Sequence, residues 1–445
     1  MPSHRAETPP RQVPILVVVV VLVLALGGGA AFALIGGGNA PAPTQRSAGA
    51  TTDSTSAPSS TPAPDPNTPT GWGPTVGELQ AAHDLVSTWT PSRLAGQVIV
   101  GRYNGYDPAV VGDLVKRLHL AGVCVTSENV TDAEQVRATT QAVTDAVAAD
   151  GRDFPPVIGV DEEGGVVEHL RGIATEFPPF AEAGVAISAD GTKGEDVVHE
   201  AAYATGLELR SFGFTWVFAP DADVTIGPAD VTIGSRSPSP VPEIAARAVA
   251  TAVDGYNESG LVSTPKHFPG HGAVTVDSHV AVPVRTAPMS EVRSHDLPPF
   301  VAAVAAHAPA MMIGHIDNRA IAPGLPASMA PAAYEFLRDD LGFQGVMITD
   351  SLGMGAVANR DRPALTALNA GADLLLMPSN TVGTHAMLVH DIEDGTIARD
   401  RIEDAAARVV ALQMWQARAA SEVPVPADVT TRAQEAAAAL SASGG

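Results

Sequence analysis

The chain has 445 residues, 45% of them hydrophobic, which is enough for one large domain or two ordinary ones with a sizeable core. Its 26 Lys and Arg residues are outnumbered by 49 Asp and Glu residues, for a net charge of −23. A surface this acidic repels a phosphate backbone, so we expect no nucleic-acid partner. The one cysteine, Cys124, excludes an intramolecular disulfide and is expected to be buried in its apolar run AGVCV.

The N-terminus has the pattern of a targeting segment. Residues 1–12 contain two arginines, and residues 13–35 form an apolar run without a charged side chain. Such a run is long enough to anchor a protein in a bilayer, and its basic start and small residues near its end also suit a cleaved signal peptide. We expect a single-pass membrane protein with its globular part outside the cell, or a secreted protein if the segment is cleaved.

The rest of the chain divides by composition. Residues 36–75 are dominated by Pro, Ser, Thr, Ala and Gly, which cannot build a core, so this segment is predicted to be a disordered linker. A globular domain is predicted over residues 76–420, and residues 421–445 form a tail too short for a second domain.

Short apolar, β-branched runs alternate with Ala-rich helical segments along the predicted domain. Continuous apolar runs are typical of strands buried on both faces of a parallel sheet, and strands that alternate with helices indicate βα units. Eight such units favour an α/β fold, a TIM-like (β/α)₈ barrel, over the alternative of an open doubly wound sheet. The eight runs are residues 95–103, 120–127, 155–163, 214–224, 261–268, 308–316, 345–352 and 372–378.

Polar side chains end most of these runs. In a barrel of parallel strands the carboxyl ends of the strands open on one face, so these side chains are expected to converge there. They are Arg102, Ser127, Asp161 to Glu163, Asp221, Asp223, Lys266, His267, His315, Asp350 and Ser351.

Two of these strand ends are carboxylates well suited to catalysis. Asp350 ends the apolar run in VMITDSLGM, and Asp161 ends VIGVD before a Gly pair that allows a ligand close to the backbone. A carboxylate in this place can act as a nucleophile, a base or an electrostatic stabiliser. Paired carboxylates at a barrel mouth are typical of glycoside hydrolysis.

The stretch KHFPGHGAVTVDSH, residues 266–279, is rich in titratable side chains. A metal site is one interpretation, but the Pro and Gly residues exclude a helix, so His267 and His271 need not share a face. Proton transfer is the favoured interpretation: Asp277 and His279 are two residues apart, and a carboxylate there would orient and stabilise the imidazolium. His271 belongs to a turn and is expected to be structural.

Several motifs in order resemble the β-N-acetylhexosaminidases of glycoside hydrolase family 3. KHFPGHG, followed four residues later by DSH, resembles that family's signature, and MITDSLGM resembles its nucleophile strand. VIGVDEEGG resembles its Asp-Gln-Glu-Gly-Gly segment. FAPDADV, IGSRS and ALNAGADLLLM match further segments, so the resemblance extends from about residue 94 to about residue 412.

The resemblance implies a retaining mechanism without a metal or organic cofactor. Asp350 would be the nucleophile and His279 the acid/base, with Asp277 as its partner. Asp161, Arg236, Lys266 and His267 would hold the sugar. VVEHL departs from the family's Arg-Val-x-Arg-Leu: Val166 and His169 stand at arginine positions, and Arg171, two residues further on, is a candidate replacement.

The predicted function is therefore that of an exo-acting β-N-acetylglucosaminidase. The resemblance and the predicted export together suggest β-GlcNAc-terminated oligosaccharides or muropeptides as substrates and peptidoglycan turnover as the process; we expect a monomer. Three alternatives stay open: a phosphorylase, because a histidine acid/base repels phosphate less than a glutamate would; a non-catalytic sugar-binding barrel; and a metal-dependent hydrolase.

Overall fold

The computed structural model describes residues 65–443 of the chain. The predicted membrane or signal segment at 13–35 lies outside the described residues, as does most of the predicted linker. None of the helices within residues 65–443 has the length and apolarity needed to cross a bilayer. Residues 65–75, the end of the predicted linker, already belong to the ordered domain, because Trp72 is only 2% exposed and Pro69 pairs with Thr75 in an antiparallel bridge.

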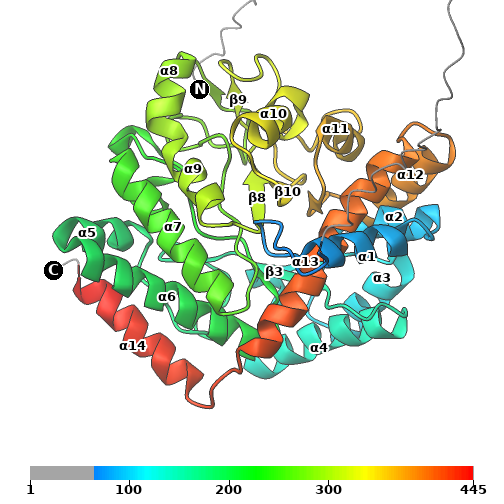
Figure 1. Cartoon of the computed structure of the whole chain (residues 1–445), viewed down its shortest axis with the longest axis horizontal. Helices are drawn as coiled ribbons and strands as arrows, with labels where there is room; N and C mark the ends of the chain where they lie inside the picture. The colour runs from blue at the N-terminus through cyan, green and yellow to red at the C-terminus, as the bar shows by residue number, and fades with distance from the viewer. Residues whose placement is uncertain (1–64, 444–445) are drawn as a thin grey trace, which may run out of the picture. The chain divides into compact units, whose positions relative to one another are not determined.

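The core of the domain is a parallel sheet in the order β11-β1-β2-β3-β6, and a parallel pair, β8 and β10, lies beside it (Figure 1). These strands are buried along their whole length, as their continuous apolar sequences predict. Their bounds are β1 Ile99–Gly101, β2 Gly122–Val125, β3 Val157–Val160, β6 Trp216–Val217, β8 Ala310–Ile313, β10 Val346–Thr349 and β11 Leu375–Leu376. The α/β fold with parallel strands is thereby confirmed.

The regular barrel predicted from the sequence is incomplete. The run at 261–268 is not a regular strand, and isolated parallel bridges connect it to its neighbours: Val262 to Trp216 on one side and Phe268 to Ile313 on the other. Pro265 lies within this run and has no N–H to donate to a ladder. A further bridge joins Ile348 of β10 to Leu374, next to β11. All eight predicted runs therefore contribute to the arrangement, but regular ladders cover only part of it.

Helices cover the strands, and most of them begin at a capping residue or a proline. Asp132, for example, accepts the N–H groups of Glu134 and Gln135 at the start of α4. The helices are α1 Val76–Val86, α2 Pro91–Gln97, α3 Pro108–Leu118, α4 Ala133–Ala149, α5 Ala181–Ala189, α6 Gly191–Ser211, α7 Pro242–Glu258, α8 Met289–Glu291, α9 Pro298–Ala305, α10 Pro331–Glu335, α11 Pro363–Ala370, α12 Thr381–Glu393, α13 Arg399–Glu422 and α14 Val429–Ala442.

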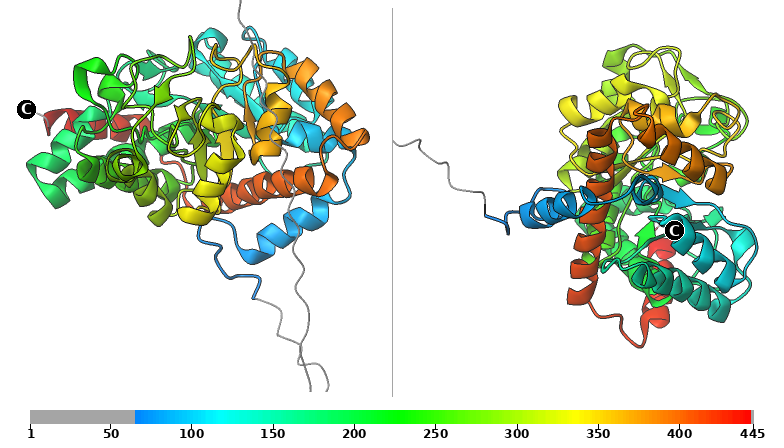
Figure 2. Two further views of the ribbon diagram at one scale, coloured as in Figure 1. Left: turned by 90° about the horizontal axis from the view of Figure 1, so that it is seen from above. Right: turned by 90° about the vertical axis from the view of Figure 1, so that its right-hand side faces the viewer.

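The C-terminal part of the chain packs against the domain. The long helix α13 lies along α1, and α14, within the predicted tail, lies along α6 (Figures 1 and 2). Ala433 and Ala436 of α14 are buried, so this helix closes part of the outer surface. Two small pairs complete the description: the antiparallel β4 Glu162–Gly164 with β5 Val167–Glu168, and the parallel β7 Val284–Arg285 with β9 Asp317–Asn318.

Candidate active site

A cavity of about 570 Å³ opens at the carboxyl ends of the central strands. Strand-end side chains that the sequence analysis singled out gather in it, together with the loop that carries His279. Among the residues that line it are Arg102, Ser127, Asp161, Glu163, His169, Arg236, Lys266, His267, His271, His279, Asp350 and Ser351. Most of the polar strand ends predicted to converge thus line one cavity, whereas Asp221, Asp223 and His315 are buried and are not among its lining residues.

Asp350 follows β10 directly and projects from the strand end into this cavity. Its residue is 7% exposed, and its Oδ1 accepts the N–H of Ser351 at 2.7 Å. Burial by itself would raise the pKa of Asp350, but the imidazoles of His315 and His267 and the Ser351 N–H outweigh it, and the pKa lies below its usual range. Asp350 is thus an ionised carboxylate at neutral pH, as a nucleophile must be.

Lys266 is the centre of a buried ion cluster under the cavity floor. Its Nζ contacts both Asp161 and Glu163, and the side chain is 2% exposed. Arg236 grips Glu163 through two hydrogen bonds, of 2.8 and 2.9 Å. Burial tends to lower the pKa of Lys266, but the two carboxylates raise it, so the lysine stays charged. Lys266 and Arg236 therefore hold Asp161 and Glu163 in place.

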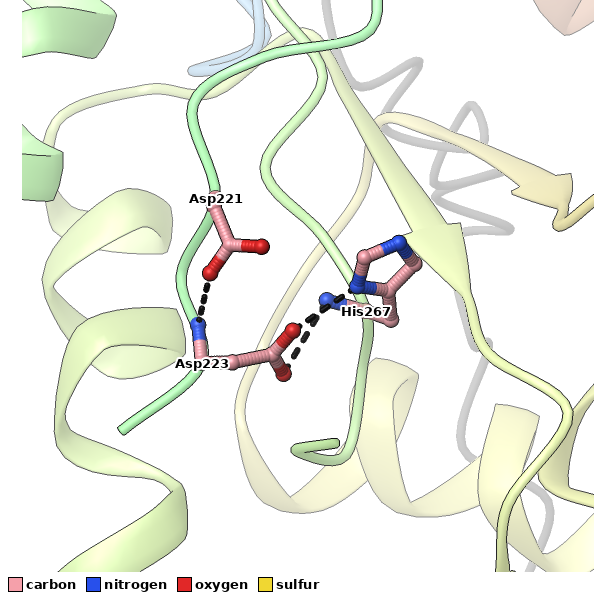
Figure 3. Close-up of side chains that lie close together, drawn as sticks. All are labelled: Asp221, Asp223 and His267. Carbon is pink, nitrogen blue, oxygen red and sulfur yellow. Dashed lines mark hydrogen bonds and ion pairs between the residues drawn. The ribbon is translucent and has the colours of Figure 1, made fainter. Parts of the chain in front are cut away.

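His267 is hydrogen-bonded to Asp223, and the Asp223 backbone N–H in turn donates to Asp221 Oδ1 (Figure 3). Its Nδ1 lies 2.8 Å from Oδ2 of Asp223, while its Nε2 is 3.5 Å from Nη2 of Arg236. Burial, and then the charge of Arg236, lower the pKa of His267 to about 4. A neutral ring with its proton on Nδ1 fits both contacts, because Nδ1–H donates to Asp223 and Nε2 faces a donor.

The donor atoms of Asp221, Asp223 and His267 lie close enough to one another to hold a metal ion. The surrounding charges do not suit a cation, however. Nη2 of Arg236 is 3.6 Å from Asp221 Oδ2, and Lys266 lies on the same side of the site. These two fixed positive charges already balance the acids and would repel a further cation, so the site does not fit a metal ion.

Asp277 and His279 form a pair at the rim of the cavity. Nδ1 of His279 lies 2.8 Å from Oδ1 of Asp277, which also accepts the His279 N–H. Burial would raise the pKa of Asp277, but these contacts with His279 lower it. The side chain of His279 is 66% exposed, so a ligand in the cavity can reach its Nε2. The histidine and the carboxylate that was predicted to orient it are therefore in contact.

His271, which the sequence predicts to be a structural residue of a turn, is buried between Asp223 and Ser278. Its N–H donates to Asp223, its Nε2 lies 3.0 Å from Ser278 Oγ, and its residue is 1% exposed. These contacts connect the strand-end segment at 266–267 with the loop at 277–279. The position suits a residue that supports the loop.

The two candidates for the missing family arginine lie in different surroundings. His169 lines the cavity: its Nδ1 accepts the N–H of Ser127, and its Nε2 lies 4.0 Å from Asp161 Oδ2. Arg171 is not among the residues that line the cavity, and it pairs with Glu168 and Glu176 instead. The exposed Val166 also lines the cavity but brings no polar group.

Sequence reasoning left several contributors to the site without a role. Glu163 bridges Lys266 and Arg236, and Asp223 orients His267. His315, buried beneath Asp350, bonds Ser328 Oγ through Nδ1 and the Ser351 carbonyl through Nε2. All three end apolar runs, so their position was a usable signal; their pairing was not visible in the sequence.

A buried carboxylate at a strand end, and a His–Asp pair on a loop at the same cavity, are compatible with glycoside hydrolysis. Residues 96–412 match the glycosyl hydrolase family 3 N-terminal domain, and the chain belongs to this family. The predictions of the family and of a glycoside hydrolase are thus confirmed.

Known proteins with similar sequences and structures agree with this assignment. A beta-hexosaminidase of Stenotrophomonas maltophilia (strain R551-3) is 34% identical over 262 residues, which are 58% of this chain and 76% of that protein. Among solved structures, a family 3 beta-N-acetylglucosaminidase from Paenibacillus sp. str. FPU-7 is 29% identical with a TM-score of 0.73, covering 80% of this chain and 69% of that one. A family 3 glycosyl hydrolase of Mycobacterium smegmatis has a TM-score of 0.65 and 28% identity, covering 74% and 98%.

Proposed function

We propose that this protein is an exo-acting, retaining β-N-acetylglucosaminidase that removes terminal β-GlcNAc from peptidoglycan fragments. The observation that carries the proposal is that Asp350 and His279, about 70 residues apart in the sequence, line one cavity. The relatives named as beta-hexosaminidase and beta-N-acetylglucosaminidase support the sugar. A volume of about 570 Å³ is within the usual range for a small-ligand pocket and suits a terminal sugar with part of its neighbour.

The first chemical step forms a glycosyl-enzyme. An oxygen of Asp350 attacks the anomeric carbon, and the bond from that carbon to the glycosidic oxygen breaks. His279 donates its proton to the departing oxygen, so the aglycone leaves as an alcohol. The carboxylate of Asp277 balances the positive charge of the imidazolium before transfer and holds its Nδ1, which leaves Nε2 to face the substrate.

The second step releases the sugar. The neutral His279 takes a proton from water as the water oxygen bonds to the anomeric carbon, and the bond to Asp350 breaks. The sugar leaves with its original anomeric configuration, and His279 is protonated again. The low pKa of Asp350 favours both steps, because an ionised carboxylate is the better nucleophile and the better leaving group.

Polar groups at the bottom of the cavity would bind the sugar hydroxyls and the N-acetyl group. Asp161 and His169 are the most accessible of them, with side chains 23% and 28% exposed. Arg236 and His267 offer donors and acceptors whose orientation is set by Glu163 and Asp223. Rigid, pre-oriented groups of this kind lose little entropy when they bind a sugar.

Phosphate as the acceptor is the second candidate, and the histidine acid/base is the observation that favours it. The exposed His279 does not repel an anion as a glutamate in its place would. The product would then be GlcNAc-1-phosphate. We further propose that the apolar segment at 13–35 places the domain outside the cell, at the membrane or secreted, where peptidoglycan is found.

The test is turnover of a chromogenic aryl β-GlcNAc glycoside by the purified full-length chain, with and without EDTA and with and without phosphate. We expect EDTA-resistant hydrolysis with β-GlcNAc as the first product by NMR, and at least a thousandfold loss in Asp350→Ala. Asp404→Ala, an exposed acid on α13, is the matched control. Loss of turnover with EDTA would indicate a metal-dependent hydrolase. GlcNAc binding without turnover would indicate a sugar-binding barrel.

A further inference from the structure

Arg102, at the end of β1, stands apart from the other arginines of the domain. Within residues 65–443, every other arginine side chain makes at least one ion pair or hydrogen bond, whereas the guanidinium of Arg102 makes none. Its backbone is fixed nevertheless, because its N–H and its carbonyl both bond Thr381 Oγ1, at 3.0 and 2.8 Å. A fixed residue with an exposed, unpartnered cation is a candidate ligand-binding group.

The side chain lies where two cavities meet. Arg102 lines the sugar cavity and also a second cavity of about 750 Å³, formed between α3 and the N-terminal end of α12. Asn104, Arg117 and Asn380 contribute polar groups to the second cavity, and Arg117 is already paired with Asp113. A ligand that extends out of the sugar cavity in this direction therefore passes Arg102.

The loop that follows Asp350 connects Arg102 with His279. A Cβ atom added at Gly353 would lie 3.5 Å from Nη1 of Arg102, so the guanidinium rests against the loop that follows Asp350. Two residues further along this loop, the Gly355 N–H bonds the carbonyl of His279. The same short loop thus contacts Arg102 on one side and the acid that protonates the leaving oxygen on the other.

The charges around the cavity leave only Arg102 to attract an anion. Lys266 and Arg236, the other cations that line it, are held by Asp161 and Glu163. In a chain of net charge −23, an uncompensated arginine at a cavity rim attracts a negatively charged group. The planar fork of a guanidinium is suited to a carboxylate, which it can bind through two parallel hydrogen bonds.

We infer that Arg102 binds a carboxylate on the aglycone, and that the enzyme selects β-GlcNAc glycosides whose leaving group is acidic. The inference rests on the proposed function and gives it a substrate class. In GlcNAc-β-1,4-MurNAc without a stem peptide, the lactyl group of the leaving MurNAc carries a free carboxylate beside the glycosidic oxygen.

The test compares GlcNAc-β-1,4-MurNAc with its methyl ester, which is the same size but uncharged, using the full-length chain. We expect kcat/KM to favour the free acid by about fivefold at low salt, in the range of a solvent-exposed ion pair, and the preference to shrink as salt is added. In Arg102→Gln the ratio of the two kcat/KM values should fall to about one. The exposed Arg432→Gln on α14 removes the same charge far from both cavities and should leave the ratio unchanged.

Each other outcome is decisive. Equal turnover of acid and ester by the wild type, or an acid preference that survives in Arg102→Gln, overturns the inference while leaving the proposed glycosidase intact. No turnover of either disaccharide or of the aryl glycoside overturns the proposed function itself. If phosphate speeds turnover, yields GlcNAc-1-phosphate and loses its effect in Arg102→Gln, then Arg102 binds the acceptor and the aglycone assignment is wrong.

Discussion

Nδ1 of His279 lies 2.8 Å from Oδ1 of Asp277, and both residues belong to one loop at the rim of the cavity. The contact fixes the orientation of the ring, because Nδ1 is occupied and Nε2 is left free. In the proposed mechanism Nε2 exchanges the proton with substrate, and a pair built from two residues of one short loop can move as a unit. Its parts can also be altered separately without disturbing the core, since both side chains are more than 40% exposed.

Asp277→Asn should reduce kcat/KM by about 100-fold. The neutral amide does not balance the charge of the imidazolium, and its NH₂ group can donate to Nδ1, which allows the ring tautomer that a carboxylate excludes. The melting temperature should not change. Steady-state kinetics on an aryl β-GlcNAc glycoside measure the effect. His199 and Glu258 form another exposed His–carboxylate pair, with 3.1 Å between Nε2 and Oε2, so Glu258→Gln is the control and should keep full activity. Full activity in Asp277→Asn would exclude the dyad.

His279→Ala should lower kcat/KM most for substrates whose leaving group must be protonated as it departs. On a disaccharide, whose leaving alkoxide is a strong base, we expect a loss in kcat/KM of at least about 100-fold. The phenolate of a dinitrophenyl glycoside leaves without protonation, so general acid catalysis contributes little to its departure. With this substrate the loss should be about tenfold or less. Equal losses with both substrates would show that His279 is not the acid.

Lys266→Met should destabilise the fold strongly. It leaves Asp161 and Glu163 without the buried cation between them, and breaking a buried ion pair on one side costs about 3–5 kcal/mol. Urea unfolding followed by circular dichroism measures the change. Lys193→Met, which removes an 82% exposed lysine paired with Asp190, should leave the midpoint unchanged. Adding Asp161→Asn to Lys266→Met should recover part of the loss, because Asp161 loses its cation in the single variant whereas Glu163 keeps Arg236.

Glu162→Gln should make the protein more stable at alkaline pH. Burial raises the pKa of Glu162 from 4.5 to about 8, although its Oε2 accepts the N–H groups of His169 and Leu170. A raised carboxyl pKa contributes stability that is fully present below about pH 4.5 and is lost as the pH rises through about 8. Glutamine accepts the same two N–H groups and stays neutral at every pH.

The gain from Glu162→Gln should be on the order of 2 kcal/mol near pH 8 and close to zero near pH 4.5. Melting temperatures of wild type and variant across this range provide the measurement. Glutamine is also what the family's Asp-Gln-Glu-Gly-Gly segment has at this position, so the substitution should be accommodated without repacking. A constant difference between the two proteins at all pH values would mean that Glu162 does not titrate in this range.

The order of the structural elements and the ends of the strands were decided by the sequence alone. Short continuous apolar runs that alternate with helical segments are typical of strands buried within a sheet, and a polar residue that ends such a run emerges at the carboxyl end of the strand. Asp350, Asp161 and Lys266 were therefore predictable, and the local spacing of Asp277 and His279 was enough to bring them into contact.

Only the tertiary structure decided which charges find partners. Lys266 contacts Asp161, 105 residues away in the chain, and Arg236 contacts Glu163, 73 residues away. Arg171 pairs with Glu168, and Arg102 pairs with no acid within the described residues. Such pairings depend on distances between strands that a one-dimensional pattern does not contain. The same holds for the run at 261–268, where a proline interrupts the ladder that its apolar composition favours.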